Sequence, residues 1–237
     1  MHKLERWLDE ATEASWTNTP EEGESLRPIA EERIHQLAAM PDEAMPVLLH
    51  AFEEGEKFRV TVVCTVIRAI GYPKNAAAIP YLLYYLGDAN FPGGIDVLGS
   101  LNEIEPMALL PSLIRVLLKQ EPTIPYNGSE RAWEFMMTGC CYYLRRCPDQ
   151  TVLQHCAPAV NFALCSALSR HPDQDKGYMY LILDIIEKVG PLVYFLPALV
   201  LLAKVQNGTQ LGTRSHQLVR SFAEEQQRPY RSITSDN

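Results

Sequence analysis

Apolar residues recur along this chain with the spacing of one helix face, and each run follows a proline. Counted from the proline, apolar side chains fill the second, third and sixth positions downstream. The five prolines are Pro46, Pro80, Pro111, Pro158 and Pro197. Those offsets lie on one side of a helix with 3.6 residues per turn, and a proline fits a helix start because its missing N–H has no partner there. The pattern therefore predicts five amphipathic helices, the fourth weakened by Asn161 in its apolar stripe.

The same prolines sit in a recurring five-residue phrase of two small or apolar residues, proline, a variable residue and an aliphatic residue. The phrase occupies residues 44–48, 78–82, 109–113, 156–160 and 195–199. Successive prolines are 34, 31, 47 and 39 residues apart. A period of roughly 30–50 residues without strand-like alternation is typical of a solenoid of stacked helix pairs.

A second apolar segment precedes each proline helix, so the chain is expected to form about five helix pairs. The preceding helices are predicted over residues 26–40, 59–70, 91–104, 129–147 and 175–189. Gly71 and Gly190 follow two of them directly, and glycine accepts the left-handed conformation that ends many helices. Ser25 is the expected N-cap of the first.

Both ends of the chain are expected to cap the repeats. Residues 1–24 form an acidic N-terminal cap that includes an amphipathic helix over residues 3–14, and residues 208–228 hold a C-terminal capping helix over residues 210–227. The repeats fill residues 25–206, and residues 229–237 are expected to be a disordered tail. The prediction is one all-α domain over residues 1–237.

The repeat pattern resembles the HEAT-like family, in its bacterial short-repeat type. The resemblance is carried by Ile70-Gly71 followed by Ala78-Ile79-Pro80-Tyr81-Leu82, and by Val189-Gly190 followed by Leu196-Pro197-Ala198-Leu199. The third repeat departs from the family pattern with Ile104-Glu105. The resemblance implies a right-handed α-α superhelix whose second helices line a concave groove, and it does not fix an activity.

In such a groove, the first and fourth positions after each proline would face the partner. They give His50, Tyr81, Tyr84, Arg115 and Phe162 as candidate binding residues. Tyrosine and arginine are enriched at binding hot spots, although the alternative that both tyrosines simply cover neighbouring helices stays open and is favoured. The last two repeats carry apolar residues at these positions, so that end is expected to be covered by the C-terminal cap or by a partner.

Charge is distributed unevenly along the chain. Residues 1–60 hold 14 acidic against 6 basic residues, and residues 61–237 hold 15 of each, within a net charge of −8. Nucleic acid is therefore not expected as a partner, since its binding needs a positive surface. The acidic end is either a solubilising cap or a docking surface for a basic partner. The residues of that candidate surface are Glu31, Glu32, Asp42 and Glu43.

No pattern for catalysis, a metal or a cofactor emerges. Cys147, Cys156 and Cys165 lie nine residues apart, and the six histidines are scattered. Neither a C-x-x-C pair nor a nucleotide-binding or nucleophile motif is present. Among HEAT-like enzymes, the hydroxylases use His-Glu pairs that are missing here and the DNA glycosylases need a basic groove, whereas bilin lyases lack a sharp signature.

We therefore expect a non-enzymatic protein-binding scaffold without a cofactor, whose partner is a protein or peptide segment rather than nucleic acid or membrane. Two alternatives stay open: a lyase-like or chaperone-like protein acting on a client, and an immunity-type inhibitor that uses the acidic end.

No signal peptide or membrane-spanning run is expected, and six cysteines fit a reducing compartment, so the predicted location is cytoplasmic. The oligomeric state is left open.

Overall fold

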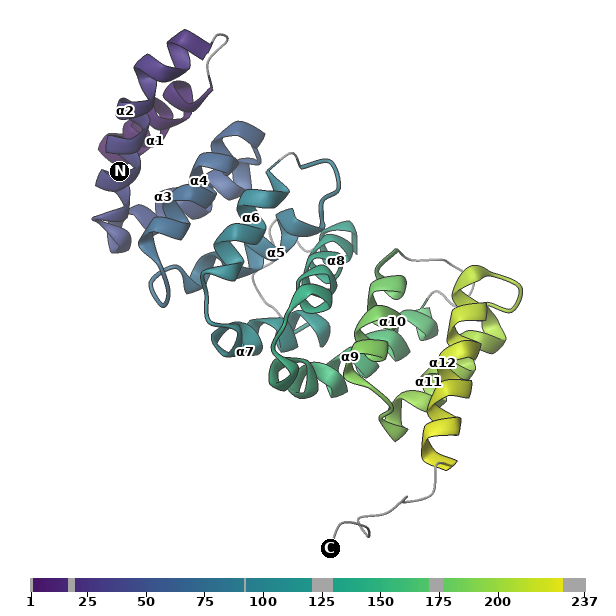
Figure 1. Cartoon of the computed structure of the whole chain (residues 1–237). Coiled ribbons are helices and arrows are strands. Elements are labelled where there is room, and N and C mark those ends of the chain that lie inside the picture. Colours follow the sequence, from purple (N-terminus) through teal and green to yellow (C-terminus); the bar gives the residue numbers. More distant parts are fainter. Residues whose placement is uncertain (1, 17–19, 92, 121–129, 171–176, 228–237) are drawn as a thin grey trace, which may run out of the picture. The chain divides into compact units, whose positions relative to one another are not determined.

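The computed structural model describes residues 2–16, 20–91, 93–120, 130–170 and 177–227, and all regular structure within these ranges is helical. The chain forms two compact units, Met1–Tyr143 and Leu144–Asn237. The elements before the boundary are α1 (His2–Ser15), α2 (Pro20–Ala38), α3 (Pro41–Glu54), α4 (Lys57–Ile70), η1 (Ala76–Ala78), α5 (Ile79–Gly87), α6 (Gly94–Asn102) and α7 (Pro106–Leu117) (Figure 1). Helix α8 (Glu130–Arg146) runs through the boundary. The second unit continues with α9 (Gln150–Arg170), α10 (Gly177–Val189), η2 (Val193–Phe195), α11 (Leu196–Val205) and α12 (Gln210–Gln227).

The helices predicted from the sequence are present, and several end where expected. Helix α12 has the predicted bounds, and α1 extends the predicted helix by one residue at each end. Gly71 and Gly190 follow α4 and α10 with φ angles of 75° and 98°, which confirms glycine as the stop signal. The predicted tail lies outside the described residues.

Among the helices expected to precede the prolines, two predicted starts are wrong by three residues or more. Helix α2 begins at Pro20 rather than near Ser25, because a proline followed by Glu21 and Glu22 makes a favourable first turn. Ser25 is therefore no N-cap, and its hydroxyl donates to the carbonyl of Glu22 at 2.9 Å. Helix α6 begins at Gly94, three residues later than predicted.

The recurring prolines begin a helix in only two of the five repeats. Pro80 and Pro197 occupy the first turns of α5 and α11, each after a short 3₁₀ turn. Pro46, Pro111 and Pro158 lie inside α3, α7 and α9. In α3 and α7 another proline, Pro41 or Pro106, already begins the helix five residues earlier, so the motif proline falls one turn inside.

The buried face of these helices is shifted by one residue from the prediction. The first, second and fifth positions after the proline are buried in all five repeats, and the sixth in four. The third position is half-buried or exposed in four repeats. The four buried positions span about 140° of the helix circumference, which is a normal core-facing stripe. Asn161 lies at the third position, so the fourth repeat has a full apolar stripe: Ala159, Val160, Ala163 and Leu164.

In the first unit, α1 packs on α2, α2 on α4, α4 on α6, and α5 on both α6 and α7 (Figure 1). Helix α8 closes against α5, where Gly87 and Gly139 let the two backbones meet. In the second unit, α9 packs on α10 and α11, and α12 packs on α10 and α11. In each unit the core therefore lies between helices that follow one another in the sequence and between helices that are separated by one other helix.

Candidate functional site

Tyr81 and Tyr84, the centre of the predicted groove, lie in the core of the first unit. Their exposed fractions are 5% and 9%. The Tyr81 ring stacks on Phe52 with centroids 5.4 Å apart, and its hydroxyl donates to Glu53 Oε1 at 2.8 Å. The Tyr84 ring meets Phe135 edge-on at 5.4 Å. Both rings thus pack against neighbouring helices and leave little exposed surface for a partner.

The other groove candidates are exposed but are not gathered at one place by any described contact. His50 Nδ1 lies 3.8 Å from Glu53 Oε2, and its Nε2 lies 3.6 Å from Glu54 Oε1. The Arg115 guanidinium reaches the Ser112 hydroxyl at 3.4 Å. Phe162 belongs to the second unit. The fourth position after the proline is exposed in every repeat except the one that holds Tyr84.

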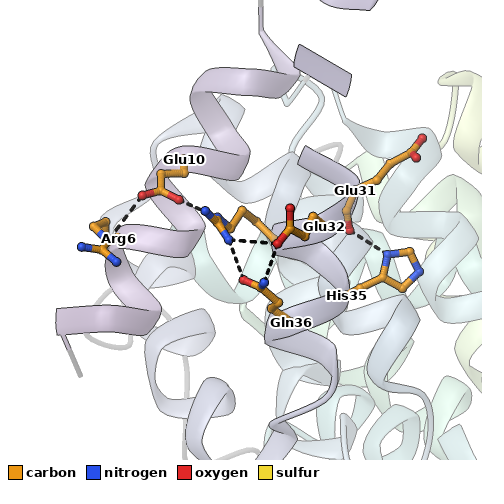
Figure 2. A network of polar contacts seen from close by, with 7 residues as sticks. Arg6, Glu10, Glu31, Glu32, His35 and Gln36 are labelled. Atoms are coloured by element: carbon orange, nitrogen blue, oxygen red, sulfur yellow. Dashed lines mark hydrogen bonds and ion pairs between the residues drawn. The ribbon is translucent and has the colours of Figure 1, made fainter. Parts of the chain in front are cut away.

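The acidic candidates Glu31 and Glu32 are exposed on α2 but take part in polar contacts within the unit (Figure 2). Arg27 Nε donates to Glu31 Oε1 at 3.0 Å. Glu32 Oε1 accepts from Gln36 Nε2 at 2.8 Å, and Arg33 Nη1 donates to Gln36 Oε1 at 2.8 Å. Much of the charge on this face of α2 is therefore already balanced by arginine.

The same network ties α2 to α1. Arg33 Nε donates to Glu10 Oε2, while Arg6 Nε lies 3.3 Å from the other oxygen of that carboxylate (Figure 2). Asp42 and Glu43 are exposed in the first turn of α3, where the helix dipole favours negative charge. The acidic residues thus stabilise helix ends and helix contacts, and a basic partner would have to displace part of these pairs.

Helix α9 presents an outward surface of a different kind. From residue 150 to residue 169 it contains no Asp, Glu, Lys or Arg, although one side of it faces solvent throughout. Its exposed residues are Gln150, Thr151, Gln154, His155, Pro158, Phe162, Cys165 and Ser169. Phe162, at the centre of this side, is 49% exposed. An exposed helix of this length ordinarily carries charged residues on its outer side, so their absence is the informative feature.

Helix α11 packs on α9 and is also uncharged along most of its length. Residues 191–203 contain no charged residue, and Val200 and Leu201 are 52% and 48% exposed. We call the exposed side chains of these two helices the α9–α11 face: those given above for α9, together with Pro197, Val200, Leu201 and Lys204. Lys204, at the end of α11, carries the one formal charge among its described side chains.

The C-terminal cap does not cover the α9–α11 face within the described residues. Helix α12 packs on α10 and α11, yet Leu201 stays half-exposed. The last buried turns of α12 place Leu218 and Phe222 in the core instead. One of the two sequence-based expectations for this end, burial by the cap, is therefore not met by α12.

The chemistry of the α9–α11 face suits binding by apolar contact. Of the six cysteines, Cys165 alone is exposed, and partial burial raises the pKa of its thiol. Burial, followed by the nearby Cys147 thiol, raises the pKa of Cys156 to about 12. A raised pKa keeps a thiol protonated and poorly nucleophilic. Among the described residues, no group of three or more His, Cys, Asp or Glu side chains is placed to hold a metal ion.

Several charged residues of the second unit form contacts on α10 and its neighbouring helices. Arg145 Nε pairs with Asp184 Oδ2 at 2.9 Å, and Arg214 Nη2 pairs with Glu187 Oε2 at 2.8 Å. The Lys188 ammonium donates to the carbonyls of Arg145 and Cys147 at the end of α8. These contacts join α8, α10 and α12, so their role is explained by packing.

Two shallow hollows hold no catalytic arrangement. One, of about 380 Å³, lies between α1, α2 and α4 beside Ser15, Arg27 and Thr65. The other, of about 370 Å³, lies between α10 and α12 beside Glu187, Arg214 and Ser221. Arg27 is paired with Glu31 and Arg214 with Glu187, and neither hollow brings a histidine or cysteine to a hydroxyl.

Comparison with protein-family models, with curated proteins and with solved structures finds no match to this chain. None of the described helices is both long and apolar enough to cross a lipid bilayer.

The sequence contained one signal for the α9–α11 face, the apolar residues of the last two repeats. The charge-free runs over residues 150–169 and 191–203 are a second signal that the sequence prediction did not use.

Proposed function

We propose that this chain is a non-enzymatic, HEAT-like repeat protein that holds a partner protein on the α9–α11 face. The binding surface is thereby placed on the second unit, and not at the buried pair Tyr81 and Tyr84 of the first. The six cysteines are free, which favours the reducing environment of the cytoplasm for this role.

Support for the HEAT-like arrangement comes from the helix contacts within each unit. In the first unit α2, α4 and α6 form one row and α5 packs on α7; in the second, α9 packs on α11 and α10 on α12. Packing between every second helix is how helix pairs stack into a solenoid. The proposal extends this stacking to the five helix pairs expected from the repeat.

The observation that carries the binding function is the lack of charge on an exposed helix pair. Phe162, Val200 and Leu201 are each about half-exposed on neighbouring helices. Depletion of charged residues and enrichment of large apolar ones distinguish the centre of a protein interface from ordinary surface. Water-facing helices without such a role keep a charged outer side.

A photo-crosslinking amino acid at position 162 tests this proposal. In the cells that make the protein, irradiation of the p-benzoylphenylalanine variant is expected to give a covalent adduct, whose partner peptide is identified by mass spectrometry. The same group at Tyr72, an exposed aromatic of the first unit, is the matched control and is expected to give none. Absence of any adduct at 162, or equal adducts at both positions, would overturn the proposal.

A further inference from the structure

We infer that the partner held on the α9–α11 face is a second copy of this chain, so that the protein is a two-fold symmetric dimer. This inference rests on the proposed function, since it uses the same face. It adds the identity of the partner, which follows from where the charges lie and from the size of the face.

The first argument is electrostatic. Residues 1–143 carry 21 acidic against 11 basic residues, a net charge of −10, and residues 144–237 carry 8 against 10, a net charge of +2. Two copies that met through the first unit would bring acid against acid. In a two-fold interface the same patch faces itself, so a patch with a net charge repels its copy, whereas an uncharged patch does not. The α9–α11 face meets that condition over its whole centre, with Lys204 at one end.

The polar residues of the face are also able to form hydrogen bonds with the same kinds of residue on a second copy. Gln154 and Ser169 lie near the two ends of α9, and Phe162 lies between them. Amide and hydroxyl groups both donate and accept hydrogen bonds, so each can pair with an identical group, which a carboxylate or an ammonium cannot do. A two-fold dimer would therefore have an apolar centre and a neutral polar rim, as stable interfaces do.

The size of the face sets the expected strength. A helix of 21 residues is roughly 30 Å long and packed helices lie about 10 Å apart. With the shorter α11 beside it, the face covers on the order of 500 Å² per copy, or about 1,000 Å² in total, which lies in the range of weak, transient interfaces. The dimer is therefore expected to dissociate at micromolar concentrations, with a Kd of about 1–100 μM.

The test uses the full chain in sedimentation equilibrium from about 0.1 to 200 μM, a range that brackets the expected Kd. The mass is expected to rise from 26.8 kDa towards twice that value as the concentration increases. Phe162→Glu and Leu201→Glu should each raise the dimer Kd at least about 30-fold, because a charge is buried at an apolar centre. Ile95→Glu changes an equally apolar but more exposed residue of α6 in the first unit, and should leave the Kd unchanged.

Cys165 offers a second measurement that needs no substitution. It is the exposed one of the six cysteines and lies three residues from Phe162 on the face. Its rate of reaction with a thiol reagent should fall at least tenfold between the dilute and concentrated limits, and should stay at the fast value in Phe162→Glu. This readout separates loss of the interface from loss of the fold, since an unfolded variant would expose all six thiols.

Added salt distinguishes this interface from one formed by the acidic end. Screening reduces the repulsion between two copies that each carry a net charge of −8, so the Kd of the proposed dimer should fall as salt rises. A dimer weakened by salt would overturn the inference, because it would be held by opposite charges.

The remaining outcomes decide between the occupants of the face. A mass of 26.8 kDa at every concentration, with a constant Cys165 rate, would overturn the second copy as partner, as would an adduct of position 162 with residues 228–237 of the same molecule. An adduct with a different protein would then preserve the proposed function, and no adduct at all would overturn both.

Discussion

Gly87 of α5 and Gly139 of α8 allow the backbones of their helices to touch. A Cβ on Gly87 would lie 1.9 Å from the carbonyl oxygen of Phe135, and one on Gly139 would lie 1.8 Å from that of Leu83. The contact is reciprocal, because each glycine faces the backbone of the other helix. It explains a glycine in the middle of α8, where the conformational freedom of glycine ordinarily costs stability.

Gly139→Ala is therefore expected to destabilise the first unit by about 3 kcal/mol, because helix backbones cannot yield as a flexible side chain can. The gain in helix propensity, about 1 kcal/mol, is too small to compensate. All three tryptophans lie in the first unit, so urea unfolding followed by tryptophan fluorescence measures the change.

Gly99→Ala is the matched control for this substitution. Gly99 also lies inside a helix, α6, but the nearest atom to an added Cβ is Arg68 Nη1 at 3.8 Å, an ordinary contact. It should stabilise the unit by about 0.5–1 kcal/mol. Equal effects of the two substitutions would contradict a special contact at Gly139.

Stability at high pH should depend on Tyr81. Burial, then its hydrogen bond and proximity to Glu53, raises the pKa of Tyr81 from 10.0 to about 12. The folded state thus holds the phenol proton more tightly than the unfolded chain does. Its contribution is fully present below pH 10 and is lost as the pH rises from 10 to 12.

We expect Tyr81→Phe to lose less stability than the native chain between pH 9 and pH 12. Tyr72→Phe, at an exposed position, should follow the native curve. Urea midpoints measured at intervals of half a pH unit give the comparison. Parallel curves for the native chain and Tyr81→Phe would show that Tyr81 contributes nothing to the pH dependence.

The same proline motif should give opposite effects in different repeats. Pro46 lies one turn inside α3, where its missing N–H removes a backbone hydrogen bond to Asp42, so Pro46→Ala should stabilise the first unit by about 1–2 kcal/mol. Pro197 lies in the first turn of α11, where proline is favourable, so Pro197→Ala should destabilise the second unit by about 0.5–1 kcal/mol. Both prolines are exposed, so neither change leaves a cavity.

Fluorescence reports the first of these changes and circular dichroism the second, since the second unit holds no tryptophan. Changes of the same sign at Pro46 and Pro197 would contradict the positions that the two prolines take in their helices.

Local signals in the sequence determined where helices form and where several of them end. The amphipathic pattern of residues 210–227 predicts α12 to the residue, and Gly71 and Gly190 stop α4 and α10 as expected. Such signals act within one or two helical turns, so they can be recognised in the sequence without knowing which other helices pack nearby. Ser25 failed as a start signal because Pro20 competes for the same helix five residues earlier.

Which side of each helix is buried was decided by the tertiary structure. Tyr81 and Tyr84 are in the core because α5 is covered by α6, α7 and α8, whereas Phe162 and Leu201, at the same motif position as Tyr84, stay exposed. A period of 3.6 residues fixes the spacing of an apolar stripe but not how many neighbours will cover the helix. The sequence thus determined the helices and the charge-free runs of α9 and α11. Only the packing of one helix on the next decided that Tyr84 of α5 lies buried while Phe162 and Leu201 face water.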